Sequence, residues 1–277
     1  MKVISINSRI MRSFTKNDIQ VLKFKALDAF SHINHAVSTR GGGVSTQKEL
    51  SSLNLGTHTS DSIENVRENY KRFCAAAGFN AKRIVLGNQT HSANIRYATE
   101  ADMGKGVFLE RDYTDVDALV TDCRNLPLVI HTADCVPVSF IDIKGRAIGN
   151  AHCGWRGTFS RLAPLTAKEL FSRFGVAPDD LFCTIGPCIC KNCYEVSKAL
   201  YDDFIAEFGD SECFINKNGK FYIDLAGLNK EVLTEYGVRE ENIVVSDICT
   251  CENSHLLFSH RAQGAERGIF ASFLELL

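Results

Sequence analysis

Two apolar, strand-like runs separated by a short polar turn limit how this chain can fold. The runs occupy residues 136–142 and 147–152, and the dipeptide Lys144-Gly145 between them is typical of a tight turn. A turn this short joins antiparallel neighbours, so the pattern predicts a β-hairpin. The fold is therefore expected to contain a sheet built at least partly from antiparallel strands.

The register of this hairpin decides where two reactive side chains lie. Closing the hairpin about its turn places Pro137 opposite His152 and Cys135 opposite Gly154. Because side chains alternate between the two faces of a strand, Cys135 and His152 are expected to be diagonal neighbours on one face. A three-residue loop or a single bulge would reverse that parity and separate the two side chains.

Short strand patterns alternate with helical patterns along the rest of the chain, without a linker, a low-complexity tract or a repeat. Further strands are expected at residues 21–25, 34–38, 83–88, 93–97, 118–121, 126–131, 181–185, 243–245, 256–259 and 270–274. One helix is expected to begin at Asp61 or Ser62 and to end at Gly78, and others to cover 166–175, 197–209 and 224–237. Hairpin-length connections favour mixed sheets with helices packed outside them, which is an α+β fold. We expect a single domain over residues 1–277.

Composition excludes several classes of partner. The 31 Lys and Arg residues nearly balance 33 Asp and Glu residues, so we expect neither nucleic acid nor a membrane as a partner. The same balance of charge predicts a small ligand. The sequence shows no apolar run as long as a membrane span and no signal core, which predicts a cytoplasmic protein. Its 11 cysteines would stay mostly reduced in that compartment. They are therefore expected to be core residues, metal ligands or nucleophiles.

A thiol and an imidazole within reach of each other are compatible with three kinds of site. They can be a buried Cys and a hydrogen-bonded core His, a metal site, or a nucleophile with its base. The segments around Cys135 and His152 carry small residues, glycines and an Arg that let a ligand approach, which favours a functional site. His91, in a polar turn between two strand patterns, offers a third donor. One Cys and two His could hold zinc and leave a fourth position open, as in catalytic zinc sites.

A series of short motifs, in one order along nearly the whole chain, resembles a known family. The motifs are STRGGGVS (38–45), SLNLGTH (52–58), NQTHSANI (88–95), DALVTD (117–122), HTADCVPV (131–138), AHCGWRGT (151–158), IGPCI (185–189), YEV (194–196), DICT (247–250) and FSHR (258–261). On these motifs the chain is identified as a member of the bacterial laccase-domain family. Its members are described as multicopper polyphenol oxidoreductases, as purine nucleoside phosphorylases and, for some, as peptidoglycan editing factors.

The resemblance implies a single-domain, four-layer α/β/β/α sandwich with mixed sheets, and a zinc ion held by His91, Cys135 and His152. It also implies phosphorolysis of adenosine, inosine and methylthioadenosine, with nucleoside and phosphate as substrates, together with deamination of adenosine. Two positions depart from the family pattern. Cys153 replaces a small residue and would add a thiol beside the metal, and the C-terminal loop keeps only Arg267 of its usual motif.

Several residues are candidates for substrate binding, because phosphorolysis requires cations and amide donors for a phosphate dianion. Arg40 is followed by three glycines that leave their N–H groups uncovered, although a plain turn would also explain the glycines. The remaining candidates each have an ordinary structural alternative and are Asn54, Arg156, His260 and Arg261.

Other functions stay open on the sequence alone. Cys135 as a nucleophile with His152 as its base would make a cysteine hydrolase, such as an amidase that edits peptidoglycan precursors. A non-catalytic binding module would not need polar loop residues concentrated at strand ends. A copper polyphenol oxidase is disfavoured, because 8 His without a His-X-His pair and 3 Met are too few ligands for a copper cluster. The His-X-Glu signature of zinc cytidine deaminases does not occur in the sequence either.

A second group of thiols lies in the later part of the sequence and comprises Cys183, Cys188, Cys190, Cys193, Cys249 and Cys251. Four of them could hold a structural zinc ion, but their spacing is not that of standard paired zinc knuckles. We therefore expect most of them to be packed thiols.

Overall fold

Two large mixed sheets form the centre of the computed structural model, which describes residues 5–277. The first sheet has the order β1 (Met11–Lys16), β2 (Ile19–Phe24), β3 (Ile33–Ser38), β15 (Phe270–Leu276), β7 (Leu128–Thr132) and β4 (Val85–Leu86). The second has the order β14 (Ile243–Val245), β10 (Leu181–Ile185), β8 (Val136–Asp142), β9 (Ile148–Cys153), β6 (Ala118–Thr121) and β5 (Ile95–Tyr97). The pairs β4–β7, β5–β6 and β10–β14 run parallel, whereas the hairpin β8–β9 and its neighbours are antiparallel. The predicted α+β class with mixed sheets is confirmed.

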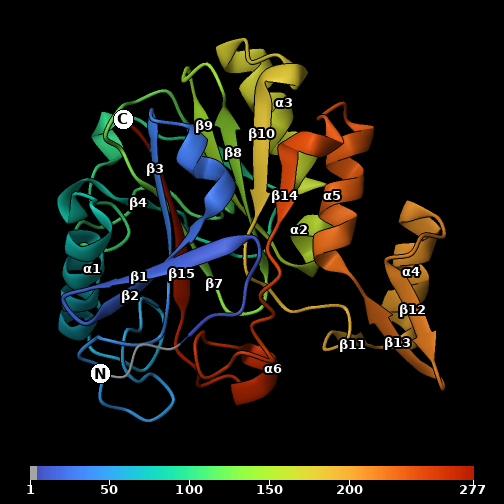
Figure 1. Ribbon diagram of the computed structural model, residues 1–277, viewed down its shortest axis with the longest axis horizontal. Coiled ribbons are helices and arrows are strands. Elements are labelled where there is room, and N and C mark those ends of the chain that lie inside the picture. Colours follow the sequence, from blue (N-terminus) through green and yellow to red (C-terminus); the bar gives the residue numbers. More distant parts are fainter. Residues whose placement is uncertain (1–4) are drawn as a thin grey trace.

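A small third sheet, missed by the sequence patterns, lies beside this pair. It has the order β11 (Glu195–Val196), β13 (Lys220–Ile223) and β12 (Phe214–Lys217), and it carries helix α4 (Lys198–Phe208). Together these elements extend to one side of the molecule in Figure 1. Their strands are only two to four residues long, which is too short for an alternating pattern to stand out.

Two other differences from the predicted strands have local causes. β1 was not predicted, because its sequence MRSFTK has few apolar residues. Asn17 and Asp18 form the turn to β2 with φ values of 52° and 62°, as a type I′ hairpin requires. The apolar segment 256–259 is buried but is not a strand: the Leu256 and Leu257 N–H groups both donate to the carbonyl of Asn253. Three consecutive apolar residues do not distinguish a buried turn from a strand.

The helices begin and end close to the predicted positions. In α1 (Ile63–Ala77), the Ser62 hydroxyl accepts a hydrogen bond from the Asn65 N–H at 3.2 Å, and Gly78 ends the helix at φ 83°. Helix α3 (Leu162–Phe174) starts four residues before the predicted segment, because Pro164 is tolerated in a first turn. The other α-helices among residues 5–277 are α5 (Leu225–Glu235) and the short α2 (Trp155–Phe159) and α6 (His260–Gln263).

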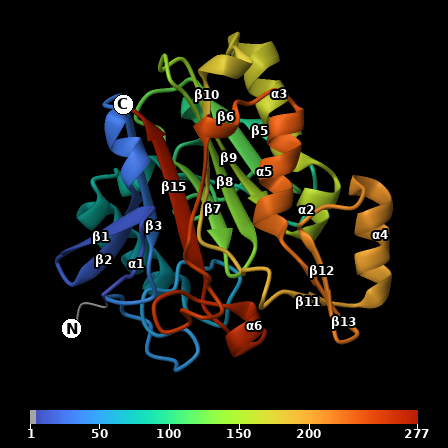
Figure 2. The same cartoon turned by 45° about the vertical axis from the view of Figure 1, so that its right-hand side comes forward.

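Alternation of side chains along the strands divides the core into layers. Phe273 of β15 packs with α1 on the outer face of the first sheet, whereas Leu274 packs between the two sheets. Ile141 of β8 lies in that same central layer, and its neighbour Phe140 points to the other face, where α3 and α5 pack. Figure 1 and Figure 2 show α1 and the pair α3 and α5 on opposite sides of the two sheets. Among residues 5–277, no helix is long and apolar enough to cross a bilayer.

The predicted register of the central hairpin is confirmed. Pro137 pairs with His152 and Val136 pairs with Cys153, without a bulge between β8 and β9. The Gly145 N–H donates to the Asp142 carbonyl at 2.9 Å and closes the turn. This register leaves Cys135, just before β8, beside the last residues of β9.

Candidate metal centre

Three side chains from separate segments converge at the open end of the hairpin. His91 follows β4 in a loop, Cys135 precedes β8, and His152 lies in β9, yet their donor atoms all lie within 4.8 Å of one another. The Cys135 Sγ atom is 3.8 Å from Nε2 of His91. The sequence predicted the approach of Cys135 to His152, and the structure brings His91 to the same point. We call these three residues the trio.

Asp117 orients the ring of His152 and holds the backbone of the loop that carries His91. Its Oδ1 atom lies 2.9 Å from Nδ1 of His152, which leaves the other ring nitrogen to face Cys135. The same carboxylate accepts the backbone N–H groups of Thr90, His91 and Ser92 at 2.9, 3.1 and 2.8 Å. A carboxylate behind a metal-ligating imidazole is the usual way to fix its ring and raise its basicity. The family resemblance contained Asp117 in its DALVTD motif, but sequence reasoning gave it no role.

The charges around the trio favour the thiolate form of Cys135. Burial opposes ionisation of Cys135, but the neighbouring His152 and His91 outweigh that effect and lower its pKa to about 6. Burial likewise opposes the charge on His152, while Cys135 and Asp117 raise its pKa to about 9. The thiolate form is the one that binds metals and attacks electrophiles, so these shifts suit both kinds of chemistry.

Gly154 leaves space for the side chains of the trio because it has no Cβ atom. A Cβ atom at this position would lie 2.9 Å from the Cys135 Sγ and 3.0 Å from Cδ2 of His91. Any larger residue would therefore push against two of the three donors. This close approach explains a glycine immediately after the β9 strand better than turn geometry does, because its φ of −62° is open to any residue.

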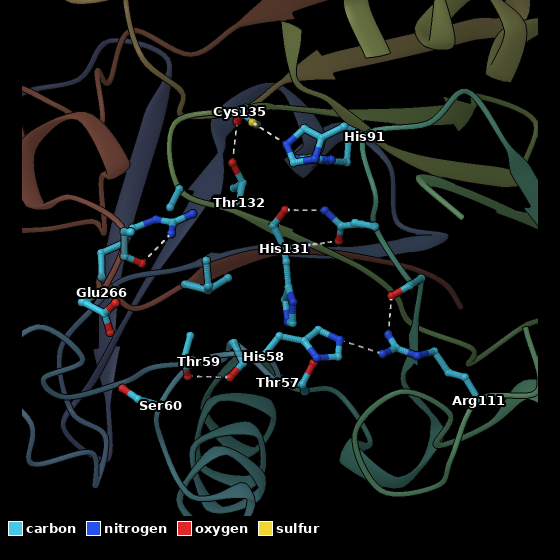
Figure 3. A pocket seen from close by; sticks show the side chains of 18 residues that line it. Thr57, His58, Thr59, Ser60, His91, Arg111, His131, Thr132, Cys135 and Glu266 are labelled. Atoms are coloured by element: carbon cyan, nitrogen blue, oxygen red, sulfur yellow. Dashed lines mark hydrogen bonds between the residues drawn. The ribbon is translucent and has the colours of Figure 1, made fainter. Parts of the chain in front are cut away.

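The trio opens into a cavity of about 340 Å³. Figure 3 shows Cys135 and His91 pointing toward each other at one end, His58 and Arg111 at the other, and His131 between them. A cavity of this size with a few convergent polar groups is typical of a small-molecule site. None of His58, Arg111 and His131 was singled out from the sequence.

The cavity wall holds His131 as a neutral imidazole. Burial lowers the pKa of His131 to about 3, with a further contribution from Arg111. The Tyr70 hydroxyl lies 2.6 Å from its Nε2 atom, and Arg111 approaches Nε2 of His58 at 3.0 Å. The signal that could have found His131 is its place at the start of the HTADCVPV motif, four residues before Cys135.

Arg267 offers a positive charge with unused hydrogen-bonding capacity. It lines the cavity, and its Nε atom is buried without a hydrogen-bond partner among residues 5–277. One terminal nitrogen donates to the Ala265 carbonyl at 3.0 Å. Buried donors are rarely left unpaired, so this guanidinium is suited to an anionic ligand.

A second cavity, of about 380 Å³, is also lined by Cys135 and His91. Two of the predicted substrate residues, His260 and Arg261, line it together with Trp155. The guanidinium of Arg261 donates to the Cys193 and Glu195 carbonyls at 2.7 and 2.8 Å. Arg156 is exposed and lies over the Trp155 ring, with its Cζ atom 4.2 Å from the ring centroid.

Two predicted substrate residues lie away from the open faces of the trio. Arg40 donates to the carbonyls of Ser51 and Ser254 at 3.2 and 2.6 Å and stacks on Phe258, and it lines neither cavity. The Gly43 N–H is already used by the Ser52 hydroxyl. The structure therefore does not bring this arginine–glycine segment to the trio, and its phosphate role stays a prediction.

Asn54 is fully buried and organises the wall of the first cavity. Its amide nitrogen donates to Thr59 and Asp61 at 2.9 and 3.1 Å, and its oxygen accepts the N–H groups of Gly56 and Ile269. All of its side-chain polar atoms are thus engaged by neighbouring protein groups, so contact with a substrate stays a prediction.

The thiol of Cys153 does not stand beside the trio as expected. Side chains alternate along β9, so Cys153 points away from His152 into the apolar layer beneath α3. Burial raises the pKa of this thiol, which makes it an inert core residue.

Comparison with known proteins shows which family the chain belongs to. The family model described as multi-copper polyphenol oxidoreductase laccase matches residues 34–277. The chain belongs to this family. The laccase-domain family includes purine nucleoside phosphorylase YlmD of Bacillus subtilis strain 168, which is 32% identical over 243 residues, covering 86% of each chain.

Two further relatives extend the comparison within the laccase-domain family. A protein named adenosine deaminase RL5, from an unknown prokaryotic organism, is 32% identical over 84% of this chain and 90% of its own length. The crystal structure of YlmD from Geobacillus stearothermophilus superposes with a TM-score of 0.88 at 30% identity, covering 96% of this chain and 98% of that one. The chain is accordingly an enzyme of the purine nucleoside phosphorylase family.

Proposed function

We propose that this protein is a zinc-dependent purine nucleoside phosphorylase that acts on adenosine, inosine and methylthioadenosine and also deaminates adenosine. The observation that carries the proposal is that the trio of one thiol and two imidazoles opens directly into a cavity lined by cationic side chains. The relatives named purine nucleoside phosphorylase and adenosine deaminase support both reactions. We further propose a cytoplasmic protein whose layers form one α/β/β/α sandwich domain over residues 1–277.

Zinc fits the donor set better than copper does. His91, Cys135 and His152 would be three protein ligands, and a fourth position facing the cavity would stay open, which is the arrangement of catalytic zinc sites. A blue-copper site would add a weak axial Met, and a coupled copper cluster would need more imidazoles than the trio supplies. Bound zinc would polarise a substrate oxygen or lower the pKa of a bound water.

The protein side chains would position phosphate and nucleoside within the cavity. Phosphorolysis joins a phosphate oxygen to the anomeric carbon of the ribose as the bond to the base breaks. Arg267, with its unpaired Nε–H, and Arg111 at the far end are the cations available to a phosphate dianion. Asp117 would keep His152 in the orientation that binds the metal.

One assay tests this function directly. Purified protein is incubated with inosine, with and without phosphate, and the products are separated. We expect hypoxanthine and ribose 1-phosphate only when phosphate is present. Release of free base at the same rate without phosphate would exclude phosphorolysis, and inosine formed from adenosine measures the deaminase activity separately.

A second candidate function rests on the pKa of Cys135. A thiolate at neutral pH beside a protonated His152 is also the arrangement of a cysteine hydrolase, for example an amidase acting on peptidoglycan precursors. This function requires a free thiolate, whereas a zinc ligand is occupied. The two functions therefore differ in whether Cys135 reacts in the metal-loaded enzyme.

A further inference from the structure

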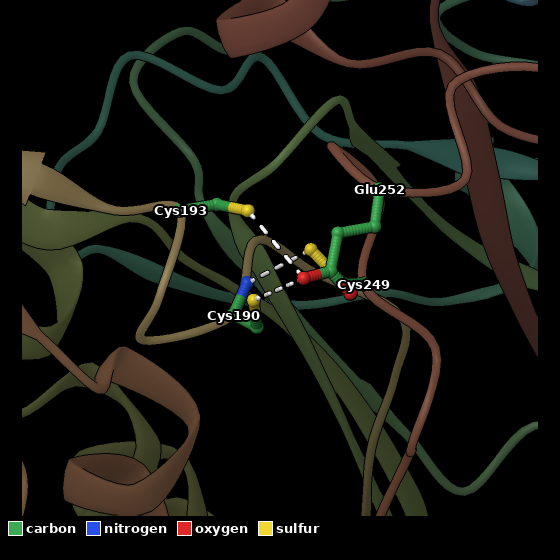
Figure 4. A group of neighbouring side chains, drawn as sticks. All are labelled: Cys190, Cys193, Cys249 and Glu252. Carbon is green, nitrogen blue, oxygen red and sulfur yellow. Dashed lines mark hydrogen bonds between the residues drawn. The ribbon is translucent and has the colours of Figure 1, made fainter.

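A second cluster of metal-ligating side chains lies outside the trio. Its members are Cys190, Cys193, Cys249 and Glu252, and their donor atoms all lie within 4.8 Å of one another. Figure 4 shows the three thiols and the carboxylate pointing toward a common centre. None of these four side chains lines the two cavities described above. We call this group the outer cluster.

The topology of the second sheet brings the outer cluster together. Strands β10 and β14 are parallel neighbours, so the loops that follow them leave the sheet at the same edge. The two loops stay side by side, with a bridge between Cys188 and Cys249 and a hydrogen bond of 3.0 Å from the Thr250 N–H to the Cys188 carbonyl. Segments about sixty positions apart in the sequence thus meet at one point.

Each loop contributes its donors at the same spacing. The first loop carries Cys190 and Cys193 with two residues between them, and the second carries Cys249 and Glu252 with two residues between them. Two C-x2-C turns facing each other build the common zinc ribbon, and here a carboxylate takes the place of the fourth thiol. Sequence reasoning missed this pairing because it considered thiols alone.

We propose that the outer cluster binds one structural zinc ion through the thiolates of Cys190, Cys193 and Cys249 and the carboxylate of Glu252. In a tetrahedral site with Zn–S bonds of about 2.3 Å and a Zn–O bond of about 2.0 Å, the sulfur–oxygen edges are about 3.5 Å. The Sγ atoms of Cys190 and Cys193 lie 3.8 and 3.9 Å from Oε1 of Glu252, so small side-chain rotations complete the site.

The backbone and the chemistry of the donors both favour this ion. The Cys190 N–H donates to the Cys249 Sγ at 3.3 Å, as backbone amides do toward the thiolates of zinc sites. Thiolates select zinc over magnesium or calcium, which prefer oxygen ligands. All cysteines among residues 5–277 are free, so no disulfide occupies these sulfurs. Four protein ligands close the site and give the ion a structural role.

The structural role concerns the second cavity. Its wall includes Ile189 and Tyr194, which flank the first loop of the outer cluster. The Cys193 carbonyl accepts a hydrogen bond from Arg261, which lines the same cavity. The Ile189 N–H donates to the carbonyl of Asp134, the residue before Cys135. A zinc ion at the outer cluster would therefore brace this wall, and the site stands independently of the proposed phosphorylase function.

Zinc stoichiometry tests the proposal when each site is removed in turn. Wild-type protein is loaded with zinc, freed of excess and analysed for metal per chain, alongside the double variants His91→Ala/Cys135→Ser and Cys190→Ser/Cys193→Ser. We expect the variant without the trio ligands to keep one zinc per chain. It should lose this zinc when Cys190→Ser and Cys193→Ser are added. Cys123→Ser, which removes a partly exposed thiol outside both groups, is the matched control and should change nothing.

Cobalt substitution identifies the ligands. With the trio removed, the protein should show a thiolate-to-cobalt charge-transfer band about threefold stronger than that of the trio alone, because three thiolates replace one. Glu252→Gln, a change at an exposed side chain, should speed transfer of zinc to a chelator at least tenfold while the circular dichroism spectrum stays unchanged.

Two results would overturn the outer zinc site. One is a trio-deficient protein that takes up no zinc or cobalt while its thiols are reduced. The other is a Glu252→Gln variant and a Cys190→Ser variant that both fold and hold zinc as tightly as the wild type. If the trio itself binds no metal, the outer cluster should still retain its one zinc, so the two assignments fail separately.

Discussion

The Nδ1 atom of His152 lies 2.9 Å from Oδ1 of Asp117, and the same carboxylate accepts the N–H group of His91. One fully buried acid therefore holds the ring of His152 and the backbone of His91. This arrangement makes Asp117 a positioning residue, whose contribution differs from that of a ligand.

Asp117→Asn should weaken zinc binding at the trio by about 10- to 100-fold, because the amide no longer stabilises a basic, oriented imidazole. The affinity is measured by competition with a chelator. Asp115→Asn is a matched control, since Asp115 lies in the same loop but contacts Thr90 and Asn94 and no member of the trio. Equal affinities of the two variants would contradict the role of Asp117.

Removal of a trio ligand should remove metal and activity together. Cys135→Ser, His91→Ala and His152→Ala should each lose about one equivalent of zinc, since a hydroxyl is a far poorer ligand than a thiolate and Ala is none. Elemental analysis of protein purified without added metal supplies the count. Copper at several equivalents with little zinc would instead contradict the proposed metal.

The pKa of Cys135 predicts how the metal-free protein reacts with iodoacetamide. Because His152 and His91 lower that pKa to about 6, alkylation should be near its maximum at pH 7 and above. It should fall as the pH drops below about 6, where the thiol is protonated. Bound zinc should slow the reaction, and chelation should restore it, as mass spectrometry of the modified peptide can show.

The opposite pattern at Cys135 would favour the hydrolase. If the zinc-loaded enzyme is alkylated rapidly at this residue alone, and Cys135→Ser keeps its metal, the thiol is a free nucleophile. A covalent adduct with an acyl-type substrate would then be expected.

Arg267→Ala should raise the KM for phosphate about tenfold or more with unchanged metal content, because it removes a guanidinium and no ligand. The sequence predicts the same effect for Arg40→Ala. The contacts of Arg40 with the Ser51 and Ser254 carbonyls predict in addition a loss of about 1 to 3 kcal/mol of unfolding free energy. The KM for phosphate and chemical denaturation, measured for both variants, separate an effect on phosphate binding from an effect on stability. If only Arg40→Ala raises the KM, Arg267 does not bind phosphate.

Glu275 should make the fold less stable as the pH rises. Burial raises the pKa of this glutamate in β15 to about 7 from 4.5, against smaller opposing effects of Asn34 and Arg83. The folded state therefore holds the proton more tightly, and its stabilising effect is complete below pH 4.5 and lost as the pH passes 7. Glu275→Gln should gain up to ~3 kcal/mol over the wild type at pH 8 and little at pH 4. Urea denaturation measures this difference, with Glu241→Gln as an exposed control; a difference that does not vary with pH would contradict it.

Features that depend on residues close together in the chain could be predicted from the sequence. The Ser62 cap and Gly78 mark the two ends of α1, and the short loop between β8 and β9 sets the register that places Cys135 next to His152, because both features depend on neighbours in the chain. The motifs identified the family, and the resemblance implied the three residues of the trio. Their metal and their reaction remain proposals.

The distant groups that support the trio depend on contacts between segments far apart in the sequence. Asp117 meets His152 because β6 pairs with β9, and Glu252 meets Cys190 because the loops after β14 and β10 leave one sheet edge together. Arg40, which the sequence placed with the substrate, is instead engaged by Ser51 and Ser254. Strand order between remote segments is set by how the layers bury their apolar faces, a property of the assembled core that no short stretch of sequence encodes.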